Sequence, residues 1–353
     1  MSEIENRKRD HLDLCRTDAV AFRDRTTLLE HVRLVHDALP EMAVDELDTR
    51  VHLFGKTLRV PLLIAAMTGG TDEAGGINRT LASIAEERGY AFGVGSQRAM
   101  QKNAGVTSTF AVRDAAPTAL VFGNLGVVQA TRGTTQGARA LVDAVSADAL
   151  CVHMNPSMEL VQREGDRDFR GNLEALARLT RELGVPVIAK ETGAGISGGV
   201  AKRLFAAGVR HVDVSGAGGT SWVGVEQKRA ESVQDARGAS LGSSLWDWGV
   251  PTAASIALVA PVGFDTVIAT GGIKSGGDVA RAIALGATCA GIARPVLQAL
   301  TSGGRDGAIA FLANVEEELR SIMLLTGSRT LADLRRAPRI VTGELRDWMA
   351  LAE

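Results

Sequence analysis

Residues 186–220 read PVIAKETGAGISGGVAKRLFAAGVRHVDVSGAGGT, and this stretch decides the fold class. It begins and ends with apolar runs, Pro186–Glu191 and His211–Gly216, and each run is continuous in hydrophobicity rather than alternating. Strands of this kind are typical of a parallel sheet that is buried on both faces. Between the runs, Val200–Ala207 has helical periodicity and stops at Gly208, a residue suited to the left-handed conformation that ends helices. The stretch therefore predicts one strand–helix–strand unit.

The same unit recurs along most of the chain. From about residue 60, eight apolar runs rich in Val, Ile and Ala can be found: Pro61–Ala66, Ala91–Gly95, Leu120–Asn124, Ala149–Asn155, Pro186–Glu191, His211–Gly216, Thr266–Gly272 and Cys289–Arg294. Four of the helical stretches between them end at a glycine: Ile77–Arg88 at Gly89, Asn172–Leu183 at Gly184, Val200–Ala207 at Gly208 and Asp278–Leu285 at Gly286. Eight alternating strands and helices predict an α/β fold, the (β/α)8 TIM barrel.

The length of 353 residues suits one large barrel with insertions better than two ordinary domains. We expect a single domain over residues 1–353, with the barrel at 56–300. Residues 1–55 are predicted to form a charged, mostly helical N-terminal extension, and residues 301–353 a polar helical tail. Ser302–Gly304 is a candidate hinge before that tail.

The composition argues against several classes of function. Hydrophobic residues make up 45% of the chain, and the net charge of −2 gives no indication of a nucleic-acid partner. Cys15, Cys151 and Cys289 are far apart and form no C-x-x-C pair, so neither a disulfide framework nor a zinc site is supported. The N-terminal MSEIENRKRDHLDL lacks the apolar region of a signal peptide, and no apolar stretch approaches the length of a membrane span. We expect a cytoplasmic protein that does not bind membranes.

Polar residues gather at the predicted carboxyl ends of the strands, where barrel enzymes build their active sites. Polar groups at so many positions near a core are costly unless something satisfies them. The ends are Met67–Gly70, Ser96–Arg98, Asn124–Gly126, His153–Asn155, Lys190–Glu191, Ser215–Thr220, Gly271–Gly272 and Ala293–Arg294. This concentration favours a ligand site over simple turn chemistry.

The last two strand ends have the character of a phosphate site. Thr270–Ile273 contains two glycines that let backbone N–H groups approach an anion, and Gly291–Arg294 opens the next predicted helix. Lys190 ends the fifth strand. It could pair with a phosphate, form a Schiff base, hold an anionic cofactor ring, or pair with Glu191 or another strand-end acid. We favour the cofactor ring, because the phosphate site lies across the barrel mouth.

A second polar group follows the fourth strand. His153 and Asn155 are two residues apart and share one face of that strand, and Glu159 lies just beyond. The Glu159 carboxylate is a hard oxygen ligand of the kind that Mg²⁺ prefers beside a diphosphate. Arg7–Arg9 form a basic cluster that is either a solvated charge run or a lid over the anion.

Together these residues resemble the type 2 isopentenyl-diphosphate isomerases over nearly the whole chain. No single motif is specific, but the ordered set is. The matching segments are Arg7–Lys8 with His11, Ala66–Gly70, Gly95–Arg98, Gly123–Gly126, His153–Asn155, Glu164–Arg167, Val187–Glu191, Asp213–Gly216 and Gly218–Thr220.

The resemblance implies interconversion of isopentenyl and dimethylallyl diphosphate in isoprenoid biosynthesis, with reduced FMN, Mg²⁺ and NADPH as the reductant, by a homo-oligomer (tetramer or octamer). It implies Lys190, His153 and Glu159 as catalytic residues and Glu159 at the metal. The residues implied at the flavin are Met67, Thr68, Gly69, Ser96, Asn124, Lys190, Ser215, Thr220, Gly271, Gly272, Ala293 and Arg294. Those implied at the prenyl diphosphate are Arg7, Lys8, Ser96, Arg98, His153, Asn155 and Met158.

One position departs from the family pattern H-x-N-x-x-Q-E: Met158 stands where glutamine is usual. A thioether cannot usefully donate or accept a proton. If that glutamine shuttles protons, the enzyme is slow or repurposed; if flavin carries all proton transfers, Met158 only changes packing. We predict retained activity, because the flavin and diphosphate positions are intact. The alternatives are an isomerase-like enzyme for an altered prenyl diphosphate and a flavin binder that has lost activity.

Two other barrel classes fit the sequence poorly. A 2-hydroxyacid oxidase needs tyrosines for its substrate and a late His/Arg pair, but Tyr90 is the only tyrosine and no histidine follows His211. An enzyme like inosine-monophosphate dehydrogenase needs a nucleophilic cysteine after the sixth strand, and Gly216–Trp222 contains none.

Overall fold

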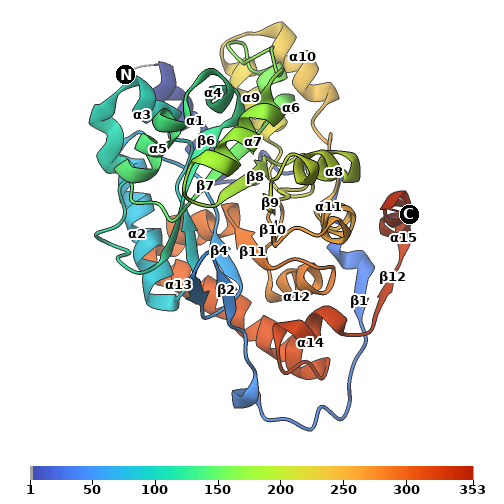
Figure 1. The fold of residues 1–353 in the computed structure, drawn as a ribbon. Coiled ribbons are helices and arrows are strands. Elements are labelled where there is room, and N and C mark those ends of the chain that lie inside the picture. The colour runs from blue at the N-terminus through green and yellow to red at the C-terminus, as the bar shows by residue number, and fades with distance from the viewer. Residues whose placement is uncertain (1–2, 353) are drawn as a thin grey trace.

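The computed structural model describes residues 3–352, and its centre is a closed barrel of eight parallel strands (Figure 1). Each strand pairs with the next along the chain, and β11 closes the ring on β4, where Gly291 lies opposite Leu63. The predicted (β/α)8 fold is confirmed. The barrel strands are β4 (Leu62–Ile64), β5 (Ala91–Gly93), β6 (Leu120–Gly126), β7 (Ala149–Met154), β8 (Val187–Glu191), β9 (His211–Asp213), β10 (Thr266–Ala269) and β11 (Cys289–Ile292).

Helices surround the barrel, and the four predicted glycine stops are confirmed. Gly89, Gly184, Gly208 and Gly286 have φ angles of 73°, 78°, 95° and 114°, a conformation that costs glycine little. The helices between the first and last barrel strands are α2 (Asp72–Arg88), α3 (Arg98–Lys102), α4 (Val127–Arg132), α5 (Thr135–Ala144), α6 (Pro156–Val161), α7 (Asn172–Glu182), α8 (Gly198–Ala206), α9 (Trp222–Ser232), α10 (Ala236–Ser244), α11 (Thr252–Val259) and α12 (Gly276–Ala284).

Several barrel strands end two or three residues earlier than the apolar runs predict. β9 stops at Asp213 rather than Gly216, and β10 stops at Ala269 rather than Gly272. The chain stays extended for part of the remainder, since the Gly216 N–H still donates to the Thr270 carbonyl at 3.0 Å. The loops after these strands thus remain close together, which positions the polar strand ends.

The N-terminal extension is not mostly helical, so that prediction is wrong. Within residues 3–55, the part of the extension that the structure describes, only α1 (Glu3–Cys15) is an α-helix. The remainder is irregular chain with two 3-10 turns, at Leu29–His31 and Val44–Glu46, and the short strands β1 (Val32–Leu34) and β2 (Val51–Leu53). Its segments obtain their contacts from distant parts of the chain. For example, the Ala253 N–H donates to the Thr27 carbonyl at 2.9 Å.

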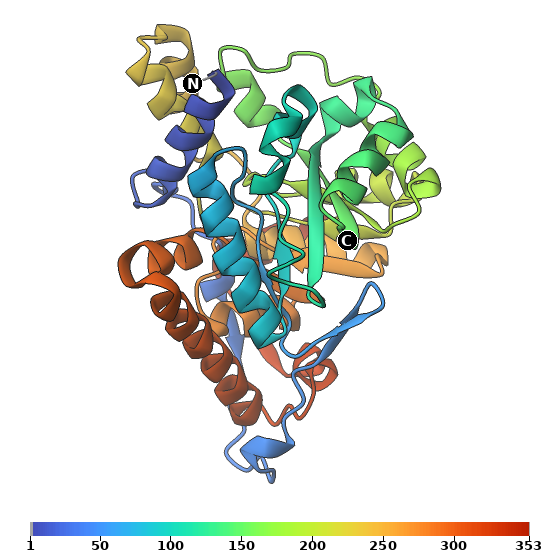
Figure 2. The same ribbon diagram turned by 90° about the vertical axis from the view of Figure 1, so that its left-hand side faces the viewer.

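The C-terminal tail is largely helical, as predicted. The long helix α13 (Arg294–Leu325) runs beside α2 (Figure 2) and contains a break at Gly304, whose φ of 61° and ψ of −157° are not helical. This break confirms a kink in the predicted hinge segment. After α13 come α14 (Leu331–Arg336), β12 (Arg339–Val341) and α15 (Gly343–Met349); β12 pairs with β1, which was not predicted.

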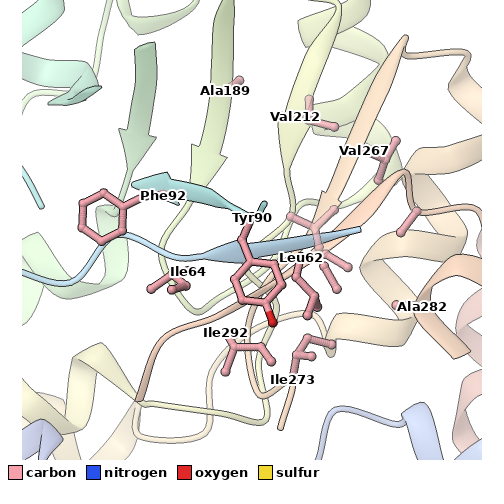
Figure 3. Packing of buried hydrophobic residues seen from close by; sticks show 14 of the residues in the cluster. Leu62, Ile64, Tyr90, Phe92, Ala189, Val212, Val267, Ile273, Ala282 and Ile292 are labelled. Atoms are coloured by element: carbon pink, nitrogen blue, oxygen red, sulfur yellow. The ribbon is translucent and has the colours of Figure 1, made fainter. Parts of the chain in front are cut away.

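Two apolar layers fill the molecule. Leu62, Ile64, Tyr90 and Phe92 belong to the larger layer, between the strands and the helices (Figure 3). The smaller layer fills the barrel interior and includes Leu63, Phe122, Ile188 and Ile268.

The hairpin of β2 and β3 (Lys56–Leu58) adds Phe54 to the interior layer. The Phe54 ring makes edge contacts with Phe122 and His211, at centroid distances of 5.8 Å and 4.8 Å. The hairpin therefore covers the amino-terminal end of the barrel and leaves the carboxyl end for a site. Within residues 3–352, no helix is both long and apolar enough to cross a membrane.

Candidate active site

A cavity of about 740 Å³ lies at the carboxyl ends of the barrel strands. It brings together nearly all the residues predicted for the site, although they come from all eight barrel strands and from α1. Those that line it are Arg7, Lys8, Met67, Ser96, Arg98, Asn124, His153, Asn155, Met158, Glu159, Lys190, Ser215, Thr220, Gly271, Gly272, Ala293 and Arg294.

Thr68 and Gly69, by contrast, are not among the described residues that line the cavity. The Thr68 carbonyl accepts hydrogen bonds from the Gly95 N–H at 3.0 Å and from the Asn78 side chain at 3.2 Å. A side chain at position 69 would collide with the ring of Phe110. Both residues directly follow the lining residue Met67, and their contact with the flavin stays a prediction.

Lys190 lies on the buried floor of the cavity and is held by neighbours on two strand ends. Its Nζ donates to Oδ2 of Asp213 at 2.8 Å and to Oγ1 of Thr270 at 3.2 Å. The Thr270 hydroxyl donates in turn to Oδ1 of Asp213 at 2.5 Å. The ion pair with a strand-end acid is thus real, but the acid is Asp213 and not the adjacent Glu191, whose carboxylate accepts from the N–H groups of Ala194 and Gly195.

Glycines form one side of the cavity where two loops meet backbone to backbone. Gly271 and Gly272 have φ angles of 97° and 75°, a region that side chains rarely adopt. A Cβ at position 271 would collide with the backbone of Gly216, and one at position 272 would collide with Thr27. Nearby, α13 begins directly after Ala293 with Arg294 and a proline in its first turn. Its first N–H groups have no partners within the helix, so this side suits an anion.

Basic side chains form another side, and burial alters their charge states. Burial, together with the charge of Arg7, lowers the pKa of Lys8 to about 7. Burial, together with the positive charges of Lys8 and Lys190, lowers the pKa of His153 to about 3, so its ring is neutral at pH 7. His153 Nδ1 lies 2.8 Å from Oδ1 of Asn124, so a neutral ring with its proton on Nδ1 leaves Nε2 free. This side of the cavity is built to receive negative charge.

Asn155, Met158 and Glu159 lie together at the start of α6. The Asn155 amide donates to Oε1 of Glu159 at 3.1 Å and approaches Sδ of Met158 at 3.6 Å. Oε2 of Glu159 accepts the Asp166 N–H at 2.7 Å. Both carboxylate oxygens are therefore oriented by the protein. No cluster of three or more His, Cys, Asp or Glu side chains able to hold a metal was found among the described residues, so any cation here needs ligands beyond Glu159.

Helix α1 carries Arg7 and Lys8 to the cavity and is anchored to α9. His11 Nε2 lies 2.8 Å from Oε1 of Glu226, and its ring contacts the edge of Trp222. Arg229 joins Oε2 of Glu226, at 2.6 Å, to Oδ2 of Asp10, at 3.1 Å. The predicted basic cluster is thus split: Arg7 and Lys8 line the cavity, whereas Arg9 pairs loosely with Asp13 on the surface.

Some lining residues could not be found from the sequence. Thr26 and Thr27 belong to the irregular N-terminal extension, yet they line the cavity, and Thr27 packs on Gly272. Trp222 also lines it, at the start of α9. Asp213 and Thr270 lie inside the predicted strands His211–Gly216 and Thr266–Gly272, but nothing in the local sequence shows that they contact Lys190.

Comparison with known proteins gives the class and then the family. Residues 129–341, more than half of the chain, match the family described as FMN-dependent dehydrogenase, a class that agrees with this barrel and its glycine-lined anion site. Proteins named isopentenyl-diphosphate delta-isomerase are closer relatives. That of Thermococcus kodakarensis is 44% identical over 97% of this chain and 93% of its own length, and that of Methanosarcina mazei is 42% identical over 99% and 95%. The chain therefore belongs to the isopentenyl-diphosphate delta-isomerase family.

Solved structures of other activities share the fold. Mandelate oxidase with (S)-2-phenylpropionate has a TM-score of 0.66 at 19% identity, covering 96% of this chain and 98% of its own. A putative lactate oxidase of Pediococcus acidilactici has a TM-score of 0.67 at 16% identity, covering 96% and 94%. At such identities the likeness concerns the fold alone. The only tyrosine, Tyr90, is buried and donates to Glu316 away from the cavity.

The residues present fit an FMN group. Three buried polar atoms on cavity-lining residues have no hydrogen-bond partner within residues 3–352: Nε of Arg7, Oγ1 of Thr192 and Nη1 of Arg294. Buried polar atoms are normally satisfied, so unpaired ones in a cavity wall point to a ligand. Gly271 and Gly272 provide backbone that a phosphate can approach, and Lys190 provides a positive charge within the barrel.

Proposed function

We propose that this protein interconverts isopentenyl diphosphate and dimethylallyl diphosphate with the help of reduced FMN. The observation that carries the proposal is that one cavity combines two different anion-binding sides. The first has the glycine loops and the start of α13, and the second has Arg7, Lys8 and His153. A flavin phosphate and a substrate diphosphate need two such sides. The names of the relatives support the same reaction.

The chain's own residues would bind the diphosphate at the basic side. Arg7 and Arg98 supply fixed charge, and Lys8 supplies a charge that is present below about pH 7 in the free protein. A bound diphosphate would raise the pKa of Lys8, because an opposite charge nearby favours the protonated form. Lys8 would then keep its charge to a higher pH than in the free protein, and binding would take up a proton.

The alkyl end of the substrate would lie against apolar groups. Met67, Met158 and Trp222 line the cavity and can exclude water from the reacting carbons. Reduced FMN supplies a nitrogen, N5, that can give and take a proton. Lys190 would place its positive charge beside the flavin ring and stabilise negative charge there. The protein's main contributions are thus orientation, desolvation and fixed charge.

Mg²⁺ and NADPH complete the proposal. Glu159 would contribute a carboxylate to Mg²⁺, with the substrate's phosphate oxygens and water supplying the other ligands, which is a usual arrangement for this ion. Oε1 and Oε2 of Glu159 each accept a single hydrogen bond, which leaves a lone pair on each for a cation. NADPH would serve only to reduce the flavin, because the isomerisation itself involves no net redox change.

A second candidate function rests on Met158. Its sulfur approaches the Asn155 amide inside the cavity, so it would lie near a bound substrate without offering a useful proton donor or acceptor. A changed prenyl diphosphate or a loss of turnover would follow if a proton must pass through this position.

The test is product analysis under anaerobic conditions. FMN-loaded protein would be incubated with isopentenyl diphosphate, Mg²⁺ and NADPH, and the products separated by chromatography. We expect dimethylallyl diphosphate, and we expect its formation to stop when Mg²⁺ is chelated. Absence of product, with turnover of a longer prenyl diphosphate, would favour the second candidate instead.

A further inference from the structure

The ammonium group of Lys190 has three N–H donors, and the structure accounts for two of them. One donates to Asp213 at 2.8 Å and one to Thr270 at 3.2 Å. Within residues 3–352, no other acceptor bonds to Nζ, and Lys190 lines the cavity. The third N–H is therefore available to a ligand, and its direction is fixed once the other two are bound.

The two acceptors are themselves fixed. Asp213 is 1% exposed, and its Oδ1 accepts from the Thr270 hydroxyl at 2.5 Å and from the Ser215 N–H at 3.2 Å. The Thr270 hydroxyl uses its single proton on Asp213 and can only accept from Lys190. Lys190, Asp213 and Thr270 thus close a ring of hydrogen bonds across β8, β9 and the end of β10, three adjacent barrel strands.

We propose that Asp213 and Thr270 are positioning residues that aim the remaining N–H of Lys190 at the flavin ring. The proposal rests on the proposed flavin site, but it concerns these three side chains. Asp213 alone would balance the charge of Lys190 without fixing its direction, because a single carboxylate can be approached from many angles. The Thr270 hydroxyl selects one of them, since it bonds to both partners.

Thr270→Val tests whether the Thr270 hydroxyl orients the Lys190 ammonium, because it removes the hydroxyl without altering any formal charge. Thr270→Ser is the control that keeps a hydroxyl at this position. Each variant would be loaded with FMN and reduced under anaerobic conditions. The absorption spectrum would then be followed against pH to find the midpoint between neutral and anionic reduced flavin. We expect Thr270→Val to move this midpoint upward by about one pH unit or more, and Thr270→Ser to return it close to the original value.

Asp213→Asn distinguishes a role of Asp213 in positioning Lys190 from a direct electrostatic effect of its carboxylate on the flavin. If Asp213 acts through Lys190, its loss frees the ammonium to turn away, and the midpoint rises as in Thr270→Val. If Asp213 acts only as a negative charge near the flavin, its removal stabilises the anion and the midpoint falls. A fall in Asp213→Asn with no change in Thr270→Val would overturn the proposal.

Asp148→Asn is the matched control, because it also removes the charge of an acid that pairs with a lysine, but at a site away from the cavity. Asp148 lies just before β7 and pairs with Lys56 at 2.8 Å, away from the cavity. This variant is expected to lose stability without a shift of the flavin midpoint. A shift equal to that of Thr270→Val would show that the readout reports general destabilisation, and the proposal would fail.

A crystal structure of the FMN-loaded native protein tests the proposal even if the variants do not fold. It should show Lys190 bonded to Asp213, Thr270 and an acceptor atom of the flavin ring. A Lys190 side chain bonded elsewhere would overturn the proposal. Neither measurement uses turnover, so a protein that binds FMN but does not isomerise isopentenyl diphosphate would refute the proposed function while leaving this inference standing.

Discussion

Lys8 shows how burial alters a single residue's chemistry. Its pKa falls to about 7, chiefly because of burial and also because of Arg7. Lys8 is therefore protonated below pH 7 and loses its charge as the pH rises above it. Diphosphate affinity should fall over that range, because a neutral amine attracts the ligand far less than an ammonium does.

We predict that the Kd for isopentenyl diphosphate rises by up to about tenfold per pH unit between pH 7 and 9. A phosphate ester has its last pKa at about 6, so the ligand's charge changes little over this range. Calorimetry on the FMN-loaded protein measures the effect. In Lys8→Met the binding should be weak but nearly independent of pH, and an undiminished slope in that variant would assign the effect to another group.

Gly271 is a residue whose lack of a side chain is required. Its φ is 97°, and a Cβ there would collide with Gly216. Gly271→Ala should therefore weaken FMN binding by about 100-fold, from backbone strain and displacement of the neighbouring loop. Fluorescence titration of FMN measures this. Gly277→Ala is the control, because the nearest atom to a Cβ there, 3.3 Å away, belongs to the flexible Arg281 side chain; an equal loss in both variants would contradict the assignment.

Most of the residues that line the cavity could be predicted from the sequence. The carboxyl ends of all eight strands meet at one end of a barrel, so residues at those ends come together whatever their detailed contacts are. The sequence placed His153, Lys190 and Gly271 for that reason. It did not predict the ring of Lys190, Asp213 and Thr270, since pairing across adjacent strands depends on register and rotamers. Thr68, which is predicted to contact the flavin, is not among the described residues that line the cavity, and its carbonyl accepts a hydrogen bond from Asn78.

Among the helices, α1 is held both by polar contacts with Glu226 and by Leu12, which packs with Ala74 and Leu297. Glu226 has a side chain only 1% exposed and binds both His11 and Arg229. Such buried charge pairs are costly to break. Because α1 carries Arg7 and Lys8, its docking should control substrate binding more than flavin binding.

We predict that Glu226→Gln raises the Kd for the diphosphate about tenfold and leaves FMN affinity unchanged. That factor corresponds to α1 being docked in about one molecule in ten. Glu73→Gln is the control: it removes the ion pair between Glu73 and Arg16, the residue directly after α1, and surface ion pairs contribute little. If Glu226→Gln weakened FMN binding equally, α1 would not be specific to the substrate side.

Helices whose ends depend on a nearby residue type could be predicted from the sequence. Segments whose conformation depends on contacts with residues far away in the chain could not. The glycine stops of α2, α7, α8 and α12 have a conformational cause within a few residues. The extension after α1 looked helical, but Val32–Leu34 pairs with Arg339–Val341, about 300 positions away. Thr27 reaches the cavity for the same reason, through a bond to Ala253.

For the whole molecule, the barrel is covered at one end and open at the other. The β2–β3 hairpin closes the amino-terminal end with Phe54, so stability and ligand binding depend on opposite ends of the same strands. A change at the covered end should therefore affect stability and leave the cavity intact.

Phe54→Ala should reduce the free energy of unfolding of the FMN-free protein by about 3 kcal/mol, the lower part of the range for losing a packed phenylalanine. Urea titration followed by circular dichroism measures this. FMN affinity at low urea should not change. Leu39→Ala, at a position that is 79% exposed, should change the free energy by less than about 0.5 kcal/mol. A loss of FMN affinity in Phe54→Ala would contradict this separation of the two ends.

In the proposed reaction, the double bond of the substrate moves because one carbon gains a proton and another carbon loses one. The most direct test follows isopentenyl diphosphate by NMR in D2O, with FMN, Mg²⁺ and a reductant under anaerobic conditions. We predict conversion to deuterated dimethylallyl diphosphate, which would also show that Met158 does not block proton transfer. No deuterium incorporation by protein that still holds FMN would contradict the account and would mean that the flavin site was kept while its chemistry was lost or redirected.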